Sequence, residues 1–215
     1  MDVQQAVDNF DLALKHCDNI VGVHRAHGGP ARGRRVQEVS LDRAVIVLAV
    51  AAWQAAVQDL TTALLDTAKP TGPTSLDVAR YNVLTGPVRK AIGDFATPNA
   101  SNTRKLMLSA GFDPRPHWKW VAAGGRGRQL VSWNPTHVDA RLDDWLKVRH
   151  ALAHGHESLP VVQALLAVRV KGVTSDPALR LDDAEACVRF LNRLVSLTAA
   201  AIATELGAPL SYPRR

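Results

Sequence analysis

The sequence predicts an all-α fold, and three observations support this prediction. Apolar residues recur at three- and four-residue spacing through most of the 215 residues, as they do along one face of an α-helix. Proline and glycine occur mainly between these periodic segments, where they begin or end helices. A composition with 47% hydrophobic and 21% charged residues is ordinary for a globular protein. We therefore expect a single domain over residues 1–215, built as a helical bundle.

The N-terminal third of the chain predicts two long helices. Asp2 is a favourable N-cap for the first helix, and Gly22 is expected to end it. Ser40 is expected to cap the second helix, which runs from residue 41 to about residue 68. This helix is apolar nearly all round, which is typical of the centre of a bundle. Its longest apolar run is broken by Gln54 and is too short to cross a bilayer, so we predict no membrane span.

Prolines divide the middle of the chain into shorter helices. Residues 74–84 predict a short helix, and Pro87 is expected to open the next one at its first turn. A further helix is predicted to start near Pro98 and to end at Gly111. Residues 113–120 contain proline and aromatic residues without helical periodicity and predict a loop.

The C-terminal segments predict a less regular stretch followed by one long helix. Residues 160–166 are expected to form one or two helical turns, and the alternation after them indicates a small hairpin or irregular segment near residues 167–175. Asp182, with Glu185 three residues later, resembles a capping box. This box is expected to open a final helix that continues to about Leu206.

The helix expected over residues 136–154 carries an arginine in an unusual place. At 3.6 residues per turn, Arg149 lies in the middle of an apolar stripe. A guanidinium does not lose its charge, so its burial requires a carboxylate or a ligand's phosphate. An arginine in such a stripe is more often part of a structural ion pair than a catalytic group. The stripe consists of Leu142, Trp145, Leu146, Leu152 and Ala153.

Histidines surround the C-terminal end of the same helix. His150 and His154 precede Gly155, which is expected to end the helix. A histidine in this position often serves only to stabilise the helix dipole. Arginine can hold a phosphate with two N–H groups, and histidine transfers protons near neutral pH. Together with Arg149, the histidines therefore favour a site that cleaves a phosphodiester.

Two glycine-rich basic loops and the net charge of +6 are compatible with a polyanionic partner such as RNA. The first loop contains Arg34 and Arg35, and the second contains Arg126 and Arg128. These arginines are candidate RNA-binding residues. The alternative for both loops is a solvated connection, because glycine and arginine alone are a weak signal.

The two cysteines, Cys17 and Cys187, both lie in helical apolar patterns. They are expected to be small core residues in a reducing compartment and not a disulfide. The amphipathic N-terminus lacks the features of a targeting signal. We therefore predict a cytoplasmic protein.

Residues 149–154 (RHALAH) resemble the R-[N/H/D]-x-x-x-H motif of HEPN domains. Residues 48–60 resemble the long early helix of the RiboL-PSP-HEPN branch, and residues 99–112 resemble its asparagine-rich helix start. The three segments occur in the same order and at similar spacing. The resemblance implies a HEPN-like helical bundle that forms a homodimer, in which two copies of the motif build one site for metal-independent RNA cleavage.

The resemblance also implies roles for individual residues. Arg149 and His154 match the catalytic residues of the motif, and His150 matches the polar residue after the arginine. Asp59 matches an acidic position and is the candidate partner of Arg149 or of a histidine; the alternative is an exposed acid on the polar strip of its helix. Gln54 stands where the branch usually has an acid. Such proteins often act as toxins or defence effectors, which implies an antitoxin or another regulatory partner.

Three alternatives remain open from the sequence. His150 and His154 have the spacing of a metal-ligand pair, with His156 as a third ligand, but no acid or cysteine is placed to complete the site. We therefore expect no metal and no cofactor. The second alternative is a HEPN fold kept as a dimerisation or nucleotide-binding module without catalysis. The third is a DNA-binding regulator, for which no recognition-helix pattern is present.

Overall fold

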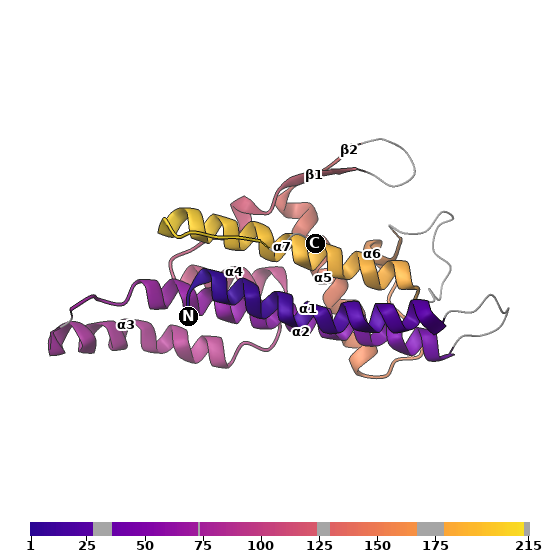
Figure 1. The fold of residues 1–215 in the computed structure, drawn as a ribbon, viewed down its shortest axis with the longest axis horizontal. Helices are drawn as coiled ribbons and strands as arrows, with labels where there is room; N and C mark the ends of the chain where they lie inside the picture. The colour runs from indigo at the N-terminus through magenta and orange to yellow at the C-terminus, as the bar shows by residue number, and fades with distance from the viewer. Residues whose placement is uncertain (28–35, 73, 124–129, 167–178, 213–215) are drawn as a thin grey trace.

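A computed structural model describes residues 1–27, 36–72, 74–123, 130–166 and 179–212, and its long helices lie side by side in an elongated bundle (Figure 1). The predicted all-α fold is confirmed for these residues, which contain one two-stranded sheet. In chain order the elements are α1 (Val3–His27), α2 (Val36–Thr67), α3 (Ser75–Gly93), α4 (Ala100–Ser109), the 3-10 turn η1 (Arg115–His117), β1 (Trp120–Ala123), β2 (Leu130–Trp133), α5 (Pro135–Ala153), α6 (Gln163–Leu166) and α7 (Leu181–Leu206).

Helix α2 is the central element of the bundle. It contacts α1, α3, α4, α5 and α7, and its Ile46, Trp53 and Leu60 are fully buried. This explains why its sequence is apolar nearly all round. Helices α2 and α7 are long and apolar enough to cross a membrane by length and composition alone, but core helices of soluble proteins pass the same test. About half of each apolar window is buried against other parts of the protein, at 56% and 50%.

The boundaries of the first two helices differ from the prediction. Helix α1 continues through Gly22 to His27, and α2 begins at Val36, so Ser40 lies inside the helix and is not its N-cap. A glycine inside a helix costs about 1 kcal/mol, which packing of a 25-residue helix can offset. Cys17 is buried, as predicted, and its thiol lies within hydrogen-bonding distance of the Val45 carbonyl oxygen.

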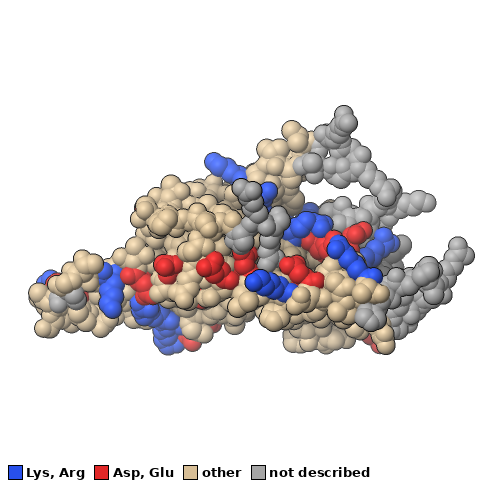
Figure 2. Space-filling view, in the orientation of Figure 1, with Lys and Arg blue, Asp and Glu red and all other residues tan. Residues whose placement is uncertain are grey.

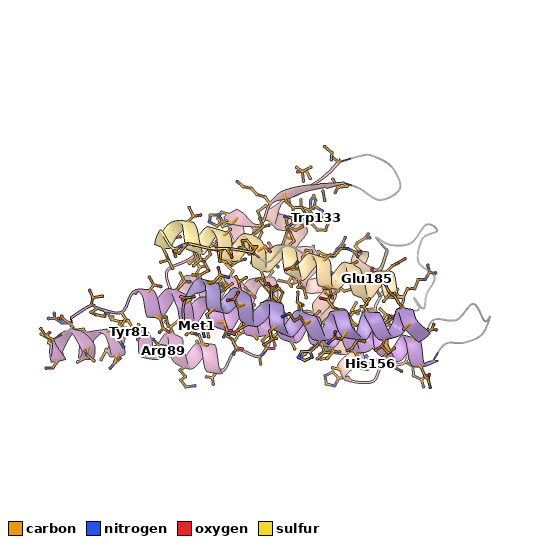
Figure 3. All side chains as sticks on the ribbon, viewed as in Figure 1. Met1, Tyr81, Arg89, Trp133, His156 and Glu185 are labelled. Atoms are coloured by element: carbon orange, nitrogen blue, oxygen red, sulfur yellow. The ribbon has the colours of Figure 1, made fainter. Side chains whose placement is uncertain are left out.

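Helix α3 is continuous where the sequence predicts a break at Pro87. Thr74 caps its N-terminus in a capping box with Asp77, and Pro87 lies inside the helix. A proline removes one helical hydrogen bond, but its φ angle is compatible with the helix. Figure 3 shows Met1, Tyr81 and Arg89 at the junction of α1, α2 and α3. The amino terminus and Arg89 both donate to Asp66 at 2.8 Å, which ties α3 to the end of α2.

The small sheet lies in a segment for which the sequence predicted only loops. Strands β1 and β2 are antiparallel, and Trp120 pairs with Trp133. The two indole rings stack with centroids 5.0 Å apart, and both pack on Phe190 of α7. Each strand has four residues, which is too short for a clear alternation in the sequence. The hairpin expected near residues 167–175 lies outside the described residues.

The last helix begins where the sequence predicts, but a different acid completes its cap. Arg180 is the N-cap, and its N–H donates to Asp183 Oδ2 at 3.0 Å. The expected pairing of Asp182 with Glu185 is wrong, because Leu181 is already the first helical residue and the third helical position is therefore Asp183. Helix α6 forms one turn within residues 160–166, where one or two turns were expected.

Candidate functional site

The motif residues lie at the C-terminal end of α5. Asn134 caps the start of this helix by accepting from the His137 N–H at 2.9 Å. At its end, Gly155 has a φ of +68°, which favours glycine. The His156 N–H donates to the Ala151 carbonyl at 3.0 Å, and the Gly155 N–H donates to the Leu152 carbonyl at 3.2 Å. These two bonds form a Schellman motif, which folds His156 back beside the helix end.

The three histidines at this helix end form a cluster. The ring centroids of His150 and His154 are 4.2 Å apart, and His156 lies 6.5 Å and 6.2 Å from them. All three side chains are exposed to solvent. The cluster therefore offers several imidazoles to a ligand that approaches from outside the bundle.

Arg149 lies at the edge of the buried face of α5 and not in its middle. The guanidinium is half-buried, but its Nε atom is fully buried and has no hydrogen-bond partner among the described residues. Burial of an unpaired guanidinium atom is unfavourable unless a ligand completes its hydrogen bonds. The predicted stripe is buried in part. Leu142 and Trp145 lie in the core, Leu146 and Leu152 pack against it, and Ala153 is exposed. The buried residues of α5 are Val138, Leu142, Trp145, Val148 and Ala151.

The expected ion pair between Asp59 and Arg149 is wrong. Asp59 Oδ2 accepts a hydrogen bond from Asn9 Nδ2 at 2.9 Å, so this carboxylate links α2 to α1. No hydrogen bond or ion pair joins Asp59 to Arg149 in the part of the chain that the structure describes. Within this chain, Asp59 therefore does not belong to the cluster at the end of α5.

Gln54 has a structural role that an acidic residue could not fill in its ionised form. Its Nε2 donates to the Phe95 carbonyl at 2.8 Å, and Gln58 Nε2 donates to the Ile92 carbonyl at 2.7 Å. Together these bonds hold the end of α3 and the segment after it against α2. That segment leads to Thr97 and then to Asn99 at the start of α4. The glutamine therefore helps to position one wall of the site.

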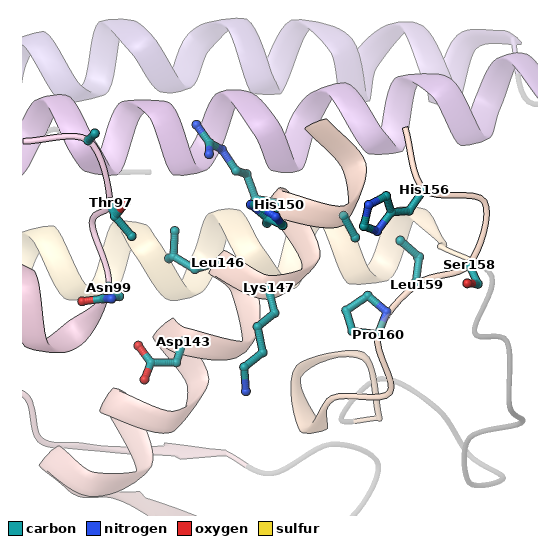
Figure 4. A pocket seen from close by; sticks show the side chains of 13 residues that line it. Thr97, Asn99, Asp143, Leu146, Lys147, His150, His156, Ser158, Leu159 and Pro160 are labelled. Carbon is teal, nitrogen blue, oxygen red and sulfur yellow. The ribbon is translucent and has the colours of Figure 1, made fainter. Parts of the chain in front are cut away.

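An open pocket of about 610 Å³ lies beside the end of α5 (Figure 4). In Figure 4, Asn99 and Asp143 form one end of the pocket, His156 and Pro160 form the other, and Lys147 lies between them. The remaining polar side chains that line it are those of Thr97, Arg149, His150 and Ser158.

His154 is not among the residues that line this pocket. The structure thus brings Arg149 together with His150 and His156 in one pocket, while His154 contributes only through its proximity to His150. Arg149 and His154 differ by about 140° in direction on an ideal helix, and it is His154 that shares a face with the pocket residues Lys147 and His150.

Sequence reasoning missed Asp143, Lys147 and the residues around Asn99 as parts of the site. A signal for the first two was present in the sequence. Positions 143, 147, 150 and 154 follow the four–three–four spacing of one helical face. The contribution of residues 97–99 comes from another part of the chain, and no periodicity could indicate it.

Positive charge outweighs negative charge in the pocket. Its one carboxylate, Asp143, accepts the Ala100 N–H through Oδ1 at 3.2 Å and has no further hydrogen bond among the described residues. Lys147 is exposed and, like Arg149, makes no ion pair within the described chain. Elsewhere the charges are mixed, and acidic and basic side chains are interspersed on the face that Figure 2 shows.

The four candidate RNA-binding residues lie outside the described residues: Arg34, Arg35, Arg126 and Arg128. Among the residues that the structure does describe, no group of three or more histidine, cysteine, aspartate or glutamate side chains is arranged to hold a metal ion.

No protein-family model, curated protein or solved structure matches this chain. The resemblance of residues 149–154 to the HEPN motif therefore stays a prediction, and the function is inferred from the chemistry of the pocket.

Proposed function

We propose that the protein is a metal-independent endoribonuclease of the HEPN type that cleaves RNA by attack of a ribose 2′-hydroxyl on the adjacent phosphate. The observation that carries this proposal is the unpaired Arg149 guanidinium in an open pocket, beside a cluster of exposed histidines. An anionic phosphate would supply the hydrogen-bond acceptor that the buried Nε lacks.

The residue types at the site suit this reaction. One imidazole takes the proton of the 2′-hydroxyl as the O2′–phosphorus bond forms. A second imidazolium gives a proton to the departing 5′-oxygen as its bond to phosphorus breaks. Arg149 stabilises the negative charge that builds up on the non-bridging oxygens. The products are a 2′,3′-cyclic phosphate and a 5′-hydroxyl, and no metal takes part in these steps.

The separation of Arg149 and His154 supports a site made by two subunits. Arg149 lines the pocket and His154 does not. In a homodimer with the ends of α5 at the interface, His154 of one chain can reach the phosphate that Arg149 of the other chain holds. The exposed position of all three histidines is compatible with such an arrangement.

Incubation of the purified protein with mixed RNA in EDTA tests the proposal. We expect cleavage in EDTA, and we expect Arg149→Ala and His154→Ala each to reduce the rate by about 10²–10⁴-fold while the protein stays folded. His137→Ala is the matched control, because His137 is an exposed histidine in the first turn of the same helix. Near wild-type cleavage by His154→Ala would overturn the assignment.

A non-catalytic nucleotide-binding module is the second candidate. It is favoured by the absence of His154 from the pocket lining, which leaves the pocket able to bind a phosphate without bringing this histidine to it. This candidate predicts that the protein binds RNA, that Arg149→Ala weakens binding, and that no RNA is cleaved with or without EDTA.

The proposed cellular role is that of a toxin or defence effector in the cytoplasm, with an antitoxin as its regulatory partner. It is supported by the resemblance to HEPN ribonucleases. Expression of the wild-type chain alone should arrest bacterial growth, and the His154→Ala chain at equal abundance should not. Equal growth of both strains would count against this role.

A further inference from the structure

A second pocket of about 490 Å³ adjoins the candidate catalytic pocket along α4 and α5. Asp143 lines both pockets, and the first residues of α4 border each of them, with Asn99 in the first and Ala100 in the second. The two pockets therefore adjoin at Asp143. Together they extend from the histidine cluster toward η1, and they are called the groove below.

The second pocket has its own free cation. Arg104 is paired with Asp113 at 2.6 Å, and Arg115 is paired with Asp139 at 2.7 Å. Lys105 is exposed on α4 and makes no hydrogen bond or ion pair within the described residues. Lys105 is thus available for an anion, whereas the charges of the two arginines are balanced by their aspartates.

The charges along the groove alternate in a way that matches a nucleic acid strand. The first pocket offers Lys147 and Arg149, the second offers Lys105, and Asp143 lies at the junction with Oδ2 free of hydrogen bonds among the described residues. A nucleic acid strand alternates anionic phosphates with uncharged nucleosides, whose base N–H groups donate to carboxylates. A groove with only basic side chains would match the phosphates but would offer no carboxylate to the nucleoside between them.

We propose that the groove binds two consecutive phosphates of one RNA strand, the first at Arg149 and Lys147 and the second at Lys105, with the nucleoside between them at Asp143. This inference rests on the proposed function, which places an RNA phosphate at Arg149. Lys105 is a binding residue in this arrangement and takes no part in the bond-breaking steps.

Binding of short 2′-fluoro RNA, which lacks the attacking hydroxyl and cannot be cleaved, tests the groove. We expect a trinucleotide with two phosphates to bind about tenfold more tightly than a dinucleotide with one, because a phosphate–lysine contact is a charge-assisted hydrogen bond. Lys105→Gln should abolish this gain and leave dinucleotide affinity unchanged. For the Lys105→Gln protein and the trinucleotide, the slope of log affinity against log salt concentration should be smaller in magnitude by about 0.7, because one phosphate contact is lost.

Lys15→Gln is the matched control, because Lys15 is an exposed lysine on α1 and lines neither pocket. An equal effect of both lysine variants, or a gain from the second phosphate that survives Lys105→Gln, overturns the groove. Cleavage of RNA without any gain from the second phosphate overturns the groove and leaves the nuclease standing. A gain in affinity that depends on Lys105, in a protein that does not cleave RNA, overturns the nuclease and leaves the groove standing. Absence of binding to either oligonucleotide overturns both proposals.

Discussion

The side chain of Asp42 is a buried carboxyl group whose ionisation opposes folding. Asp42 is 3% exposed, and burial raises its pKa to about 6. His24, whose Nε2 is 3.5 Å from Oδ1, lowers this pKa when protonated, whereas Glu38, Asp183 and Glu185 raise it further. The folded protein therefore holds a proton on Asp42 more tightly than the unfolded chain does.

This difference predicts a loss of stability as the pH rises. Because the folded pKa is raised, the contribution of Asp42 is fully present below about pH 4 and is lost as the pH rises through about 6. A shift of this size corresponds to about 3 kcal/mol. Asp42→Asn, which is uncharged at every pH, should remove this fall. Urea unfolding at pH 4 and pH 7 measures it, and parallel curves for both proteins would contradict the prediction.

Arg149 should lower the stability of the free protein while it serves the reaction. Its buried Nε has no partner among the described residues, and such a group costs about 1–3 kcal/mol. We expect Arg149→Met to raise the melting temperature and to abolish RNA cleavage. Lys147→Met, at an exposed position in the same pocket, should leave the melting temperature nearly unchanged. A destabilised Arg149→Met protein would indicate that the arginine has a structural partner.

At the residue scale, the sequence could identify the helix that carries the site but not its partners. The spacing of Arg149, His150 and His154 follows from one helix, whose geometry is known in advance. The pairing of Asp59 with Asn9 depends on how α1 crosses α2, and this crossing is set by packing between distant segments. For the same reason, the contribution of Asn99 to the pocket could not be read from the sequence.

Two glycines in different elements should respond in opposite directions to the same substitution. A Cβ atom at Gly22 or at Gly155 would meet no atom within 4 Å, so only the backbone distinguishes them. Gly155→Ala should destabilise the protein by about 1–2 kcal/mol, because its φ is +68°. Gly22→Ala lies within α1 and should stabilise it by about 0.5–1 kcal/mol.

Thermal melts of the two glycine variants measure these changes. Gly155→Ala should also reduce RNA cleavage, because the Schellman motif positions His156 at the pocket. A Gly155→Ala melting temperature equal to or above that of the wild type would show that the end of α5 does not require a left-handed residue.

At the element scale, the sequence predicted most helices and misplaced several of their ends. Periodicity found the helices because each one buries a continuous face. Three residues that were expected to mark helix ends were misleading, because each lies inside a helix that tertiary contacts maintain. They are Gly22, Ser40 and Pro87. The hairpin of β1 and β2 was missed because contacts with a distant part of the sequence stabilise it. Trp120 stacks on Trp133, and both rings pack on α7.

At the scale of the whole molecule, the sequence indicated a bundle around one apolar helix, and the structure places α2 in that position. The site then lies on the outside of the bundle, where α5 ends beside the segment that enters α4. Such a location leaves the histidines exposed within one chain and accessible to a second copy. A site shared by two chains cannot be recognised from helical periodicity within one chain.

We predict that the protein is a homodimer and that its two chains share the catalytic residues. Sedimentation velocity at micromolar concentration should show dimers, and full activity of a monomer would contradict the shared site. A mixture of Arg149→Ala and His154→Ala chains provides a sharper measurement. After random exchange about half of the dimers contain one chain of each kind, and each such dimer retains one intact Arg149 and one intact His154.

If these two residues act on the same phosphate from opposite subunits, the mixed dimers should recover cleavage that neither variant shows alone. Chains that carry both substitutions, mixed with Arg149→Ala chains, are the matched control, because no dimer in that mixture contains an intact arginine. Heterodimer formation is verified by co-purification of differently tagged chains. Verified heterodimers without recovered cleavage would mean that each chain needs its own Arg149 and His154, and the shared site would be wrong.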